Sequence, residues 1–228
     1  MTTGKLSRVR ALIFDLDGTL IDSEQDLILS VKAMLGEIGR PDLPEEIISG
    51  YIGHGAPRLV RRALGENATE EELERALQFF LAYYEEHKLD NTCPYPGVAE
   101  TLAALSAFPM AVCTNKPAGI SVRILDALGL SRYFRVVYGG NSFGTKKPDP
   151  YGTRQILKEL NASAEEVLFI GDSDVDVQTA RNAGTIAAIA HYGFGVYDHA
   201  ANPADVSLNE FGDLIALLAE ARPSANRK

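Results

Sequence analysis

The sequence has 228 residues, 46% hydrophobic and 23% charged, which is the composition of a soluble globular protein with a sizeable core. Its formal net charge of -9 argues against a general binder of nucleic acid or of anionic membranes. The two cysteines exclude a disulfide framework and a cysteine zinc site, and with neither a signal peptide nor a membrane-spanning run the expected compartment is the cytoplasm.

The first predicted strand covers residues 9–13 and is followed at once by acidic residues. Branched apolar residues are typical of a short buried strand, and the side-chain period of two places Asp15 and Asp17 on one side of its end. Gly18 then lets the backbone turn away. Because an unpaired buried carboxylate is strongly disfavoured, the pair predicts a bound cation and suits a nucleophile beside a general acid/base. The alternative is an ordinary polar turn.

Residues 22–91 are predicted to form helices and no strand. Ser23 and Asp26 resemble a capping box at the start of the first helix, whose apolar residues follow at helical spacing. Three more helices are expected, over residues 45–49, 57–64 and 69–87. Thr69 is a plausible N-cap for the last of them. Proline and glycine in residues 94–97 then interrupt the pattern, as in a linker.

From residue 97 onward, strands alternate with helices. The predicted strands cover residues 110–113, 134–138, 167–170 and 186–190. This alternation implies right-handed crossovers and a parallel, doubly wound sheet. We therefore predict an α/β fold: a Rossmann-like core of residues 1–21 and 92–228, with residues 22–91 inserted as an all-helical domain.

Three further polar clusters follow predicted strands: Thr114-Asn115, Lys146-Lys147, and the run from Asp172 through Asp174 to Asp176. In a doubly wound sheet, ligands bind beyond the carboxyl ends of the strands, so these clusters are expected to meet the first acidic pair. A hydroxyl, an amide and an ammonium suit phosphate oxygens, and three close acids repel one another unless a hard divalent cation holds them. Taken singly, the first two clusters have ordinary alternatives as a helix cap and a solvated lysine pair.

In this order the clusters resemble the haloacid dehalogenase superfamily, and within it the phosphatases. The resemblance covers nearly the whole chain. It is carried by Asp15-Leu-Asp-Gly-Thr, Thr114-Asn115, Lys147-Pro148, and Gly171-Asp172-Ser173 with Asp176. A closer similarity, to phosphoglycolate phosphatases, is carried by residues 51–56, 113–117, 133–134, and 137–140 leading to 146–148. Residues 22–91 resemble the movable cap that such enzymes carry after their first strand.

The resemblance implies a magnesium-dependent phosphomonoester hydrolase, with 2-phosphoglycolate as the expected substrate. Asp15 would attack phosphorus to form an aspartyl-phosphate, and Asp17 would act as general acid and then general base. Mg2+ would be bound by a carboxylate oxygen of Asp15, the carbonyl oxygen of Asp17 and the carboxylate of Asp172. Asp176 would lie behind these ligands.

The resemblance also implies where the substrate is bound. Thr114, Asn115 and Lys147 would bind the phosphoryl oxygens, where negative charge accumulates. In the cap, His54 and Arg58 are the candidates for substrate selection, each with the alternative of an ordinary surface side chain. The expected partner is a small phosphate ester, with no nucleic acid and no membrane, and the chain is expected to be a monomer or a homodimer.

Two other functions fit the same residues. A phosphosugar mutase would use the same two aspartates but return the phosphoryl group to a sugar. A catalytically silent binding module would keep the fold without turnover. Product analysis distinguishes a hydrolase, which releases free phosphate, from a mutase, which yields an isomerised sugar phosphate. Metal binding without turnover would favour the silent binding module.

Overall fold

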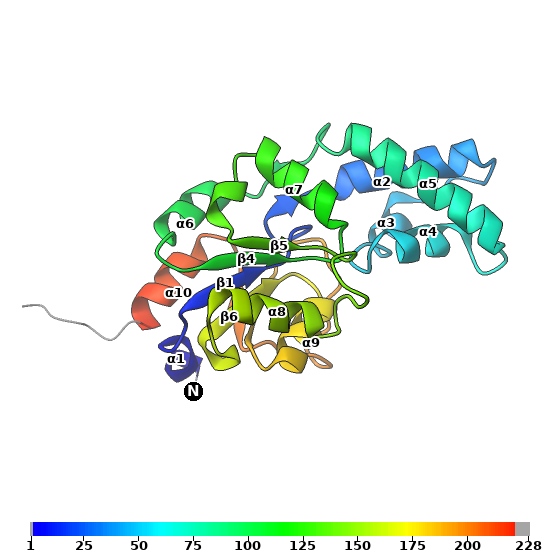
Figure 1. Cartoon of the computed structure of the whole chain (residues 1–228). Helices are drawn as coiled ribbons and strands as arrows, with labels where there is room; N and C mark the ends of the chain where they lie inside the picture. Colours follow the sequence, from blue (N-terminus) through cyan, green and yellow to red (C-terminus); the bar gives the residue numbers. More distant parts are fainter. Residues whose placement is uncertain (1, 222–228) are drawn as a thin grey trace, which may run out of the picture.

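The computed structural model describes residues 2–221 (Figure 1). At its centre is a six-stranded parallel sheet with the strand order β5-β4-β1-β6-β7-β8, which confirms the predicted fold class. The strands are β1 Ala11–Phe14, β4 Met110–Cys113, β5 Val136–Tyr138, β6 Val167–Gly171, β7 Ile186–Ala190 and β8 Val206–Leu208. The predicted end of the core, residues 222–228, lies outside the described residues.

The chain winds outward twice from β1. It first places β4 and β5 on one side of β1, and then β6, β7 and β8 on the other. In the register, Phe14 lies opposite Val112 of β4 and opposite Ile170 of β6. The topological switch point is therefore at β1, and the carboxyl ends of β4, β1 and β6 lie side by side.

Helices cover both faces of the sheet. Leu12 and Phe14 of β1 belong to an apolar cluster shared with α6, α7 and α10, whereas Ala11 and Ile13 belong to a second cluster shared with α8 and α9. This alternation is the side-chain period of a strand, and it explains why β1 is apolar at every position. The covering helices are α6 Val98–Ala104, α7 Ala118–Ala127, α8 Tyr151–Leu160, α9 Asp174–Ala183 and α10 Asp213–Ala221. Shorter elements are α1 Thr2–Leu6, η1 Ser131–Tyr133 and η2 Ala164–Glu166.

Four helices lie between the first and second strands of the large sheet and project to one end of the molecule (Figure 1). They are α2 Glu24–Glu37, α3 Glu45–Ser49, α4 Ala56–Leu64 and α5 Glu70–His87. We call residues 22–91 the helical insert. The predicted N-cap of α5 is confirmed: the Glu72 N–H donates to Thr69 Oγ1 at 3.2 Å, and the Thr69 N–H donates to Glu72 Oε2 at 3.0 Å.

The two connections of the helical insert to the core are joined to each other. Strands β2 Ile21–Asp22 and β3 Cys93–Pro94 pair as a short antiparallel sheet. Beside them, the Asp26 carboxylate is 1% exposed and accepts hydrogen bonds from the backbone N–H groups of Asn91 and Thr92 and from their side chains. One buried charge on α2 therefore holds the segment that returns to the core.

The predicted capping box at the start of α2 is wrong. Ser23 occupies the N-cap position, but its side chain makes no cap hydrogen bond. Its hydroxyl instead donates to Asp17 Oδ1 at 2.6 Å, and Asp26 accepts from residues 91 and 92. Each of these contacts joins a carboxylate to a donor from another part of the chain. Hydrogen bonds to a charged carboxylate are stronger than the hydrogen bonds of a neutral helix cap.

The sequence pattern also missed the shortest strands and the final helix. Strand β8 has three residues and a single polar position, and β2 and β3 have two residues each. Segments this short show no periodicity that separates a strand from a loop. Only their pairing with distant residues makes them strands.

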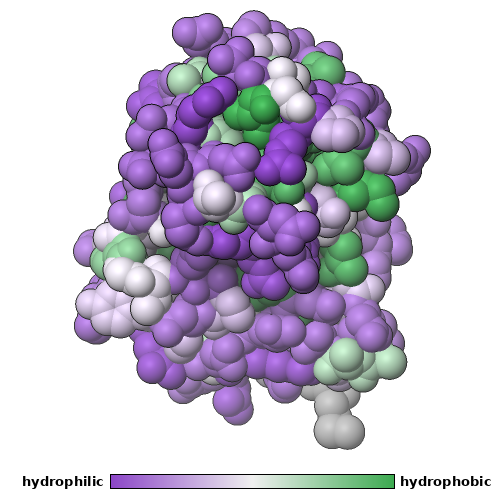
Figure 2. Space-filling view, turned by 90° about the vertical axis from the view of Figure 1, so that its right-hand side faces the viewer, coloured by the Kyte–Doolittle hydropathy of each residue, from purple (hydrophilic) through white to green (hydrophobic). Residues whose placement is uncertain are grey.

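The face of the molecule shown in Figure 2 is mostly hydrophilic, with smaller hydrophobic patches between the polar residues. None of the helices within residues 2–221 combines the length and the apolar character that a membrane crossing requires.

Candidate active site

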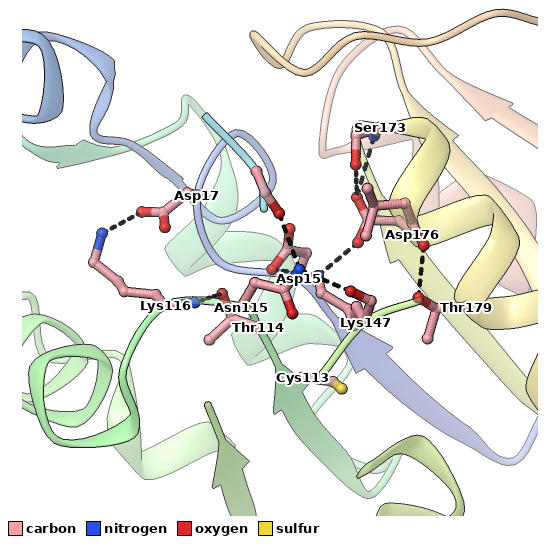
Figure 3. Close-up of polar contacts among 12 residues, drawn as sticks. Asp15, Asp17, Cys113, Thr114, Asn115, Lys116, Lys147, Ser173, Asp176 and Thr179 are labelled. Carbon is pink, nitrogen blue, oxygen red and sulfur yellow. Dashed lines mark hydrogen bonds and ion pairs between the residues drawn. The ribbon is translucent and has the colours of Figure 1, made fainter. Parts of the chain in front are cut away.

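Polar side chains from three adjacent strands meet at the carboxyl edge of the large sheet (Figure 3). Asp15 follows β1, Thr114 follows β4, and Asp172 follows β6. Lys147, from the loop before α8, and Asp176, in the first turn of α9, complete the group. All five side chains belong to buried residues. The strand order brings together residues that the sequence separates by up to 161 positions, counting from Asp15 to Asp176.

Three carboxylates form an acidic cluster in this group. Oxygen atoms of Asp15, Asp172 and Asp176 all lie within 4.8 Å of one another. One cation contacts two of them: Lys147 Nζ is 2.8 Å from Asp15 Oδ1 and 2.6 Å from Asp176 Oδ1. The cluster therefore holds three acidic groups against a single ammonium.

The pKa values reflect this crowding. Burial raises the pKa of Asp15 to about 7 against the opposing charge of Lys147, and the charge of Asp176 adds to the rise. Burial also raises the pKa of Asp172 well above its usual value, and the charges of Asp176 and Asp15 raise it further. For Lys147, burial disfavours the charged form, but attraction to Asp15 and Asp176 outweighs it and raises the pKa of the ammonium.

A divalent cation fits this cluster. When all three carboxylates are ionised, the single ammonium leaves two negative charges uncompensated in a buried place, which is unfavourable without a further partner. Asp15 Oδ1 accepts no aligned hydrogen bond among the described residues. Carboxylate oxygens are the ligands that Mg2+ prefers in proteins.

The oxygens of Asp176 are already engaged. Its Oδ1 accepts from Lys147 Nζ, and its Oδ2 accepts from the hydroxyl of Ser173 at 2.6 Å and from the Ser173 N–H at 3.1 Å. Both oxygens of Asp176 therefore have partners in the protein, and its place behind Asp15 and Asp172 in a metal site stays a prediction. The third acid of the run, Asp174, is half-buried and accepts from the Asp198 N–H and from Asn202 Nδ2, so it holds a nearby loop instead.

Three glycines, at positions 18, 193 and 195, let the backbone approach Asp172 closely. A Cβ atom on Gly18, whose φ is +79°, would overlap the Asp172 carboxylate. A Cβ on Gly193 would overlap the carbonyl oxygen of Gly18 and approach the Asp172 side chain. The Gly195 N–H donates to Asp172 Oδ2 at 2.7 Å. Nothing in the sequence pattern marks the 193–195 loop as part of the site.

Asp17 has surroundings unlike those of Asp15. Its Oδ1 accepts from the Ser23 hydroxyl at 2.6 Å and from Lys116 Nζ at 2.7 Å. The Lys116 side chain is 3% exposed, and its ammonium lies 4.5 Å from the ring centroid of Tyr84. Burial disfavours the charge on Lys116, but Asp17 outweighs this effect and raises the pKa of the ammonium. Lys116 is not among the residues for which the sequence predicts a role, although it directly follows Thr114-Asn115.

Asn115 joins the helical insert to the core. Its Nδ2 donates to the carbonyl oxygen of Gly53 at 3.0 Å and to that of Lys147 at 3.1 Å. Both amide hydrogens are thus occupied, so a contact of Asn115 with a phosphate oxygen would come from the main chain. Thr114 Oγ1 accepts from the Lys116 N–H at 3.2 Å, and its own hydrogen can point elsewhere.

A cavity of about 40 Å³ lies above Asp15 and Asp17, between the core and the helical insert. From the core it is also lined by residues 114–117 and Ile120. From the insert it is lined mostly by apolar side chains: Leu27, Ile52, Ala56, Leu59, Phe80, Leu81 and Tyr84. The space suits a small ligand with one polar end at the sheet.

His54 and Arg58 do not line this cavity. They line a separate groove with Arg62, Lys146 and other residues, and Arg58 Nη1 lies 3.5 Å from His54 Nδ1. Burial lowers the pKa of His54, and the positive charge of Arg58 lowers it further. The groove reaches Lys147, so it borders the site from the side opposite to Lys116.

Comparisons with known proteins agree with this geometry. The family model of the haloacid dehalogenase-like hydrolases matches residues 12–190. A phosphoglycolate phosphatase of Pseudomonas syringae pv. tomato is 43% identical over 199 residues, which cover 84% of this chain and 72% of that protein. A phosphoglycolate phosphatase of Aquifex aeolicus is 37% identical over 212 residues, covering 92% of this chain and 97% of that protein.

The fold similarity extends over the same length. The crystal structure of a predicted phosphoglycolate phosphatase from Haemophilus somnus has a TM-score of 0.87 and 31% identity, covering 92% of this chain and 98% of that one. That coverage includes most of both the sheet and the helical insert. The chain belongs to the haloacid dehalogenase-like hydrolase family, and its similarity extends to phosphatases of that family.

Proposed function

We propose that this hydrolase cleaves a small acidic phosphomonoester, with 2-phosphoglycolate as the expected substrate. One observation carries the proposal: a narrow cavity holds two carboxylates in unlike surroundings, Asp15 beside Lys147 and Asp17 beside Lys116. Asp15, beside Lys147, would meet the phosphoryl group, and Asp17, in the same cavity, would meet the ester oxygen, so the positions of the two carboxylates suit a nucleophile and a proton donor. Relatives at 37% and 43% identity that are named phosphoglycolate phosphatase support the choice of substrate.

In the proposed mechanism, a carboxylate oxygen of Asp15 attacks phosphorus while the bond from phosphorus to the ester oxygen breaks. Asp17 gives its proton to the leaving oxygen, so the alcohol departs neutral. Asp17 then takes a proton from a water molecule that attacks the aspartyl-phosphate at phosphorus. The bond from phosphorus to Asp15 breaks, inorganic phosphate leaves, and the Asp15 carboxylate is restored.

Charge on the phosphoryl group needs stabilisation throughout. The buried ammonium of Lys147 and the hydroxyl of Thr114 are proposed to bind the non-bridging oxygens, where low polarity strengthens each contact. Mg2+ held by the Asp15 carboxylate, the carbonyl oxygen of Asp17 and the Asp172 carboxylate would polarise the phosphoryl group and reduce its repulsion from Asp15.

The helical insert, residues 22–91, is proposed to act as a cap on the core of residues 1–21 and 92–228. Its apolar side chains face the cavity, and its Gly53 carbonyl is bound by Asn115. Closure of such a cap excludes water from the reaction. The same apolar lining favours a short substrate over a phosphosugar, whose hydroxyls would be buried without hydrogen-bond partners, so hydrolysis is favoured over the mutase reaction.

A panel of phosphate esters tests the function. The protein is incubated with 2-phosphoglycolate, ethyl phosphate, a hexose phosphate and an aryl phosphate, each with Mg2+ and with excess chelator. We expect free phosphate from 2-phosphoglycolate at the highest kcat/KM and none after chelation. An isomerised hexose phosphate without free phosphate would instead identify a mutase, and no product from any ester would favour a silent binding module.

Asp172 provides the test of the metal site. Asp172→Ala removes one of the proposed ligands, and we expect Mg2+ affinity to fall by at least about 10- to 100-fold, the range known for weaker perturbations of metal sites. Mg2+ titration calorimetry measures this loss without substrate. Asp174→Ala is the matched control, because Asp174 holds a loop and lies outside the acidic cluster. Equal Mg2+ affinity in both variants would contradict the proposed site.

A further inference from the structure

The cavity contains one cation that phosphoryl binding does not use. Among the residues that line it, the charged ones are Asp15, Asp17 and Lys116. Lys147 contacts Asp15 but does not line this cavity. Figure 3 shows the two lysines on opposite sides of the site, Lys116 beside Asp17 and Lys147 beside Asp15. Each catalytic carboxylate therefore has its own ammonium.

Lys116 has a second polar neighbour at the cavity. Tyr84, in α5 of the helical insert, is 2% exposed and lines the cavity, and its ring lies 4.5 Å from the Lys116 ammonium. The hydroxyl of Tyr84 is buried, and its one polar neighbour, the Lys116 ammonium, can only donate, so the hydroxyl hydrogen has no acceptor among the described residues. An unsatisfied buried hydroxyl is unfavourable, and a bound ligand that accepts its hydrogen would remove the penalty.

The substrate chemistry places a second anion at this point. In 2-phosphoglycolate, the ester oxygen is bonded to a CH2 group that also carries the carboxylate. A general acid must lie within hydrogen-bond reach of the oxygen that it protonates, about 2.6–3.2 Å. If Asp17 protonates the ester oxygen, the carboxylate carbon of the substrate, two bonds from that oxygen, also lies near Asp17. The ammonium of Lys116 is 2.7 Å from Asp17 Oδ1 and therefore lies in the right region.

We propose that Lys116 and Tyr84 form the site that binds the substrate carboxylate, so that this pair determines specificity for acidic phosphomonoesters. The proposal rests on the proposed function. An ammonium has three hydrogens, and Asp17 accepts one of them, so a second can be donated to the ligand. The apolar side chains around the pair keep water away, which strengthens the attraction between the ammonium and a carboxylate. His54 and Arg58, in the neighbouring groove, are then not needed for carboxylate recognition.

The test compares two substrates that differ only in the carboxylate. Ethyl phosphate has a methyl group where 2-phosphoglycolate has its carboxylate. We define the preference ratio as kcat/KM for 2-phosphoglycolate divided by kcat/KM for ethyl phosphate. Lys116→Met should lower this ratio by about 10- to 100-fold, as expected for loss of a hydrogen bond to a charged group. Tyr84→Phe removes only the hydroxyl, and it should lower the ratio by about 3- to 10-fold.

Two further variants complete the design. Lys158→Met removes the same charge from an exposed position on α8 and should leave the ratio unchanged. Arg58→Ala tests the rival position in the groove. Circular dichroism confirms that each variant is folded, and if Lys116→Met does not fold, the conservative Tyr84→Phe decides the question.

The outcomes separate this proposal from the proposed function. Equal losses on both substrates in Lys116→Met would show that Lys116 serves only Asp17, and the proposal would be overturned. It would also be overturned by a collapse of the ratio in Arg58→Ala alone, or by a wild-type protein that hydrolyses both esters equally well. A wild-type protein that hydrolyses neither ester would contradict the proposed function itself. A lowered ratio in both Lys116→Met and Tyr84→Phe supports the pair.

Discussion

Asp15→Asn should lower turnover of phosphate esters by about 10⁴-fold or more, a loss typical of removing a nucleophile. The amide keeps the shape of the carboxylate but has no negative charge with which to attack phosphorus. The fold should survive, because the change removes one of three crowded acids and leaves Lys147 paired with Asp176 at 2.6 Å. Steady-state release of phosphate, with the thermal midpoint measured alongside, tests both parts of this expectation.

The matched control for this experiment is Asp126→Asn, which makes the same chemical change at an exposed position on α7. It should retain wild-type turnover. Mass spectrometry of the quenched wild-type enzyme should also show one added phosphoryl group that is missing from Asp15→Asn. A folded Asp15→Asn variant with more than a tenth of the wild-type rate would show that the nucleophile lies elsewhere.

Asp26→Ala should lower the free energy of unfolding by about 3–5 kcal/mol, as expected when one partner is removed from a buried hydrogen-bonded charge network. The Asp26 carboxylate accepts from the Asn91 N–H at 3.0 Å, the Thr92 N–H at 2.9 Å and the Thr92 hydroxyl at 2.7 Å. The alanine variant would leave the donors of the buried Thr92, and the partly buried N–H of Asn91, without this acceptor. Urea unfolding of the wild type and the variant measures this difference in free energy, which is read from the shift in midpoint when both proteins have the same m-value.

Asp42→Ala is the control for Asp26. Asp42 also lies in the helical insert, but its carboxylate is exposed and contacts Lys32 at 3.4 Å. Exposed ion pairs of this kind contribute little to stability, so the unfolding curve should hardly move. If Asp26→Ala were as mild as this control, rearranged side chains or water would have to satisfy the donors of residues 91 and 92, and Asp26 would not secure the connection.

Much of the fold could be predicted because its strongest signals are local. The strands at 110–113 and 167–170 are continuous apolar runs that end in polar residues, and such runs are typical of strands buried on both faces. The positions of Asp15, Thr114 and Asp172 after three strands followed from the same pattern. The rule that ligands bind at the switch point of a doubly wound sheet was enough to bring them together.

The remaining features depend on contacts between distant residues. Lys116 and Asp17 are 99 positions apart in the chain, and nothing near Lys116 in the sequence indicates that its ammonium reaches Asp17. Ser23 was assigned to a helix cap because the local pattern offers no competing partner, yet Asp17 is its partner in the fold. His54 lies between two glycines as the sequence suggested, but the loop turns it into the neighbouring groove.

The short β2–β3 pair has a consequence for how this architecture can vary. Asp22 and Cys93 are paired across it, so the segment between them begins and ends at neighbouring points, about 5 Å apart for paired antiparallel residues. The helical insert therefore leaves and re-enters the core at one place, and its length does not alter the strand order of the large sheet. Loop-closure entropy grows only slowly with length, so longer or shorter inserts can be grafted at this point at little cost to the core. A hydrolase whose helical insert selects the substrate, as proposed for this chain, can acquire a new substrate range by exchange of one contiguous segment.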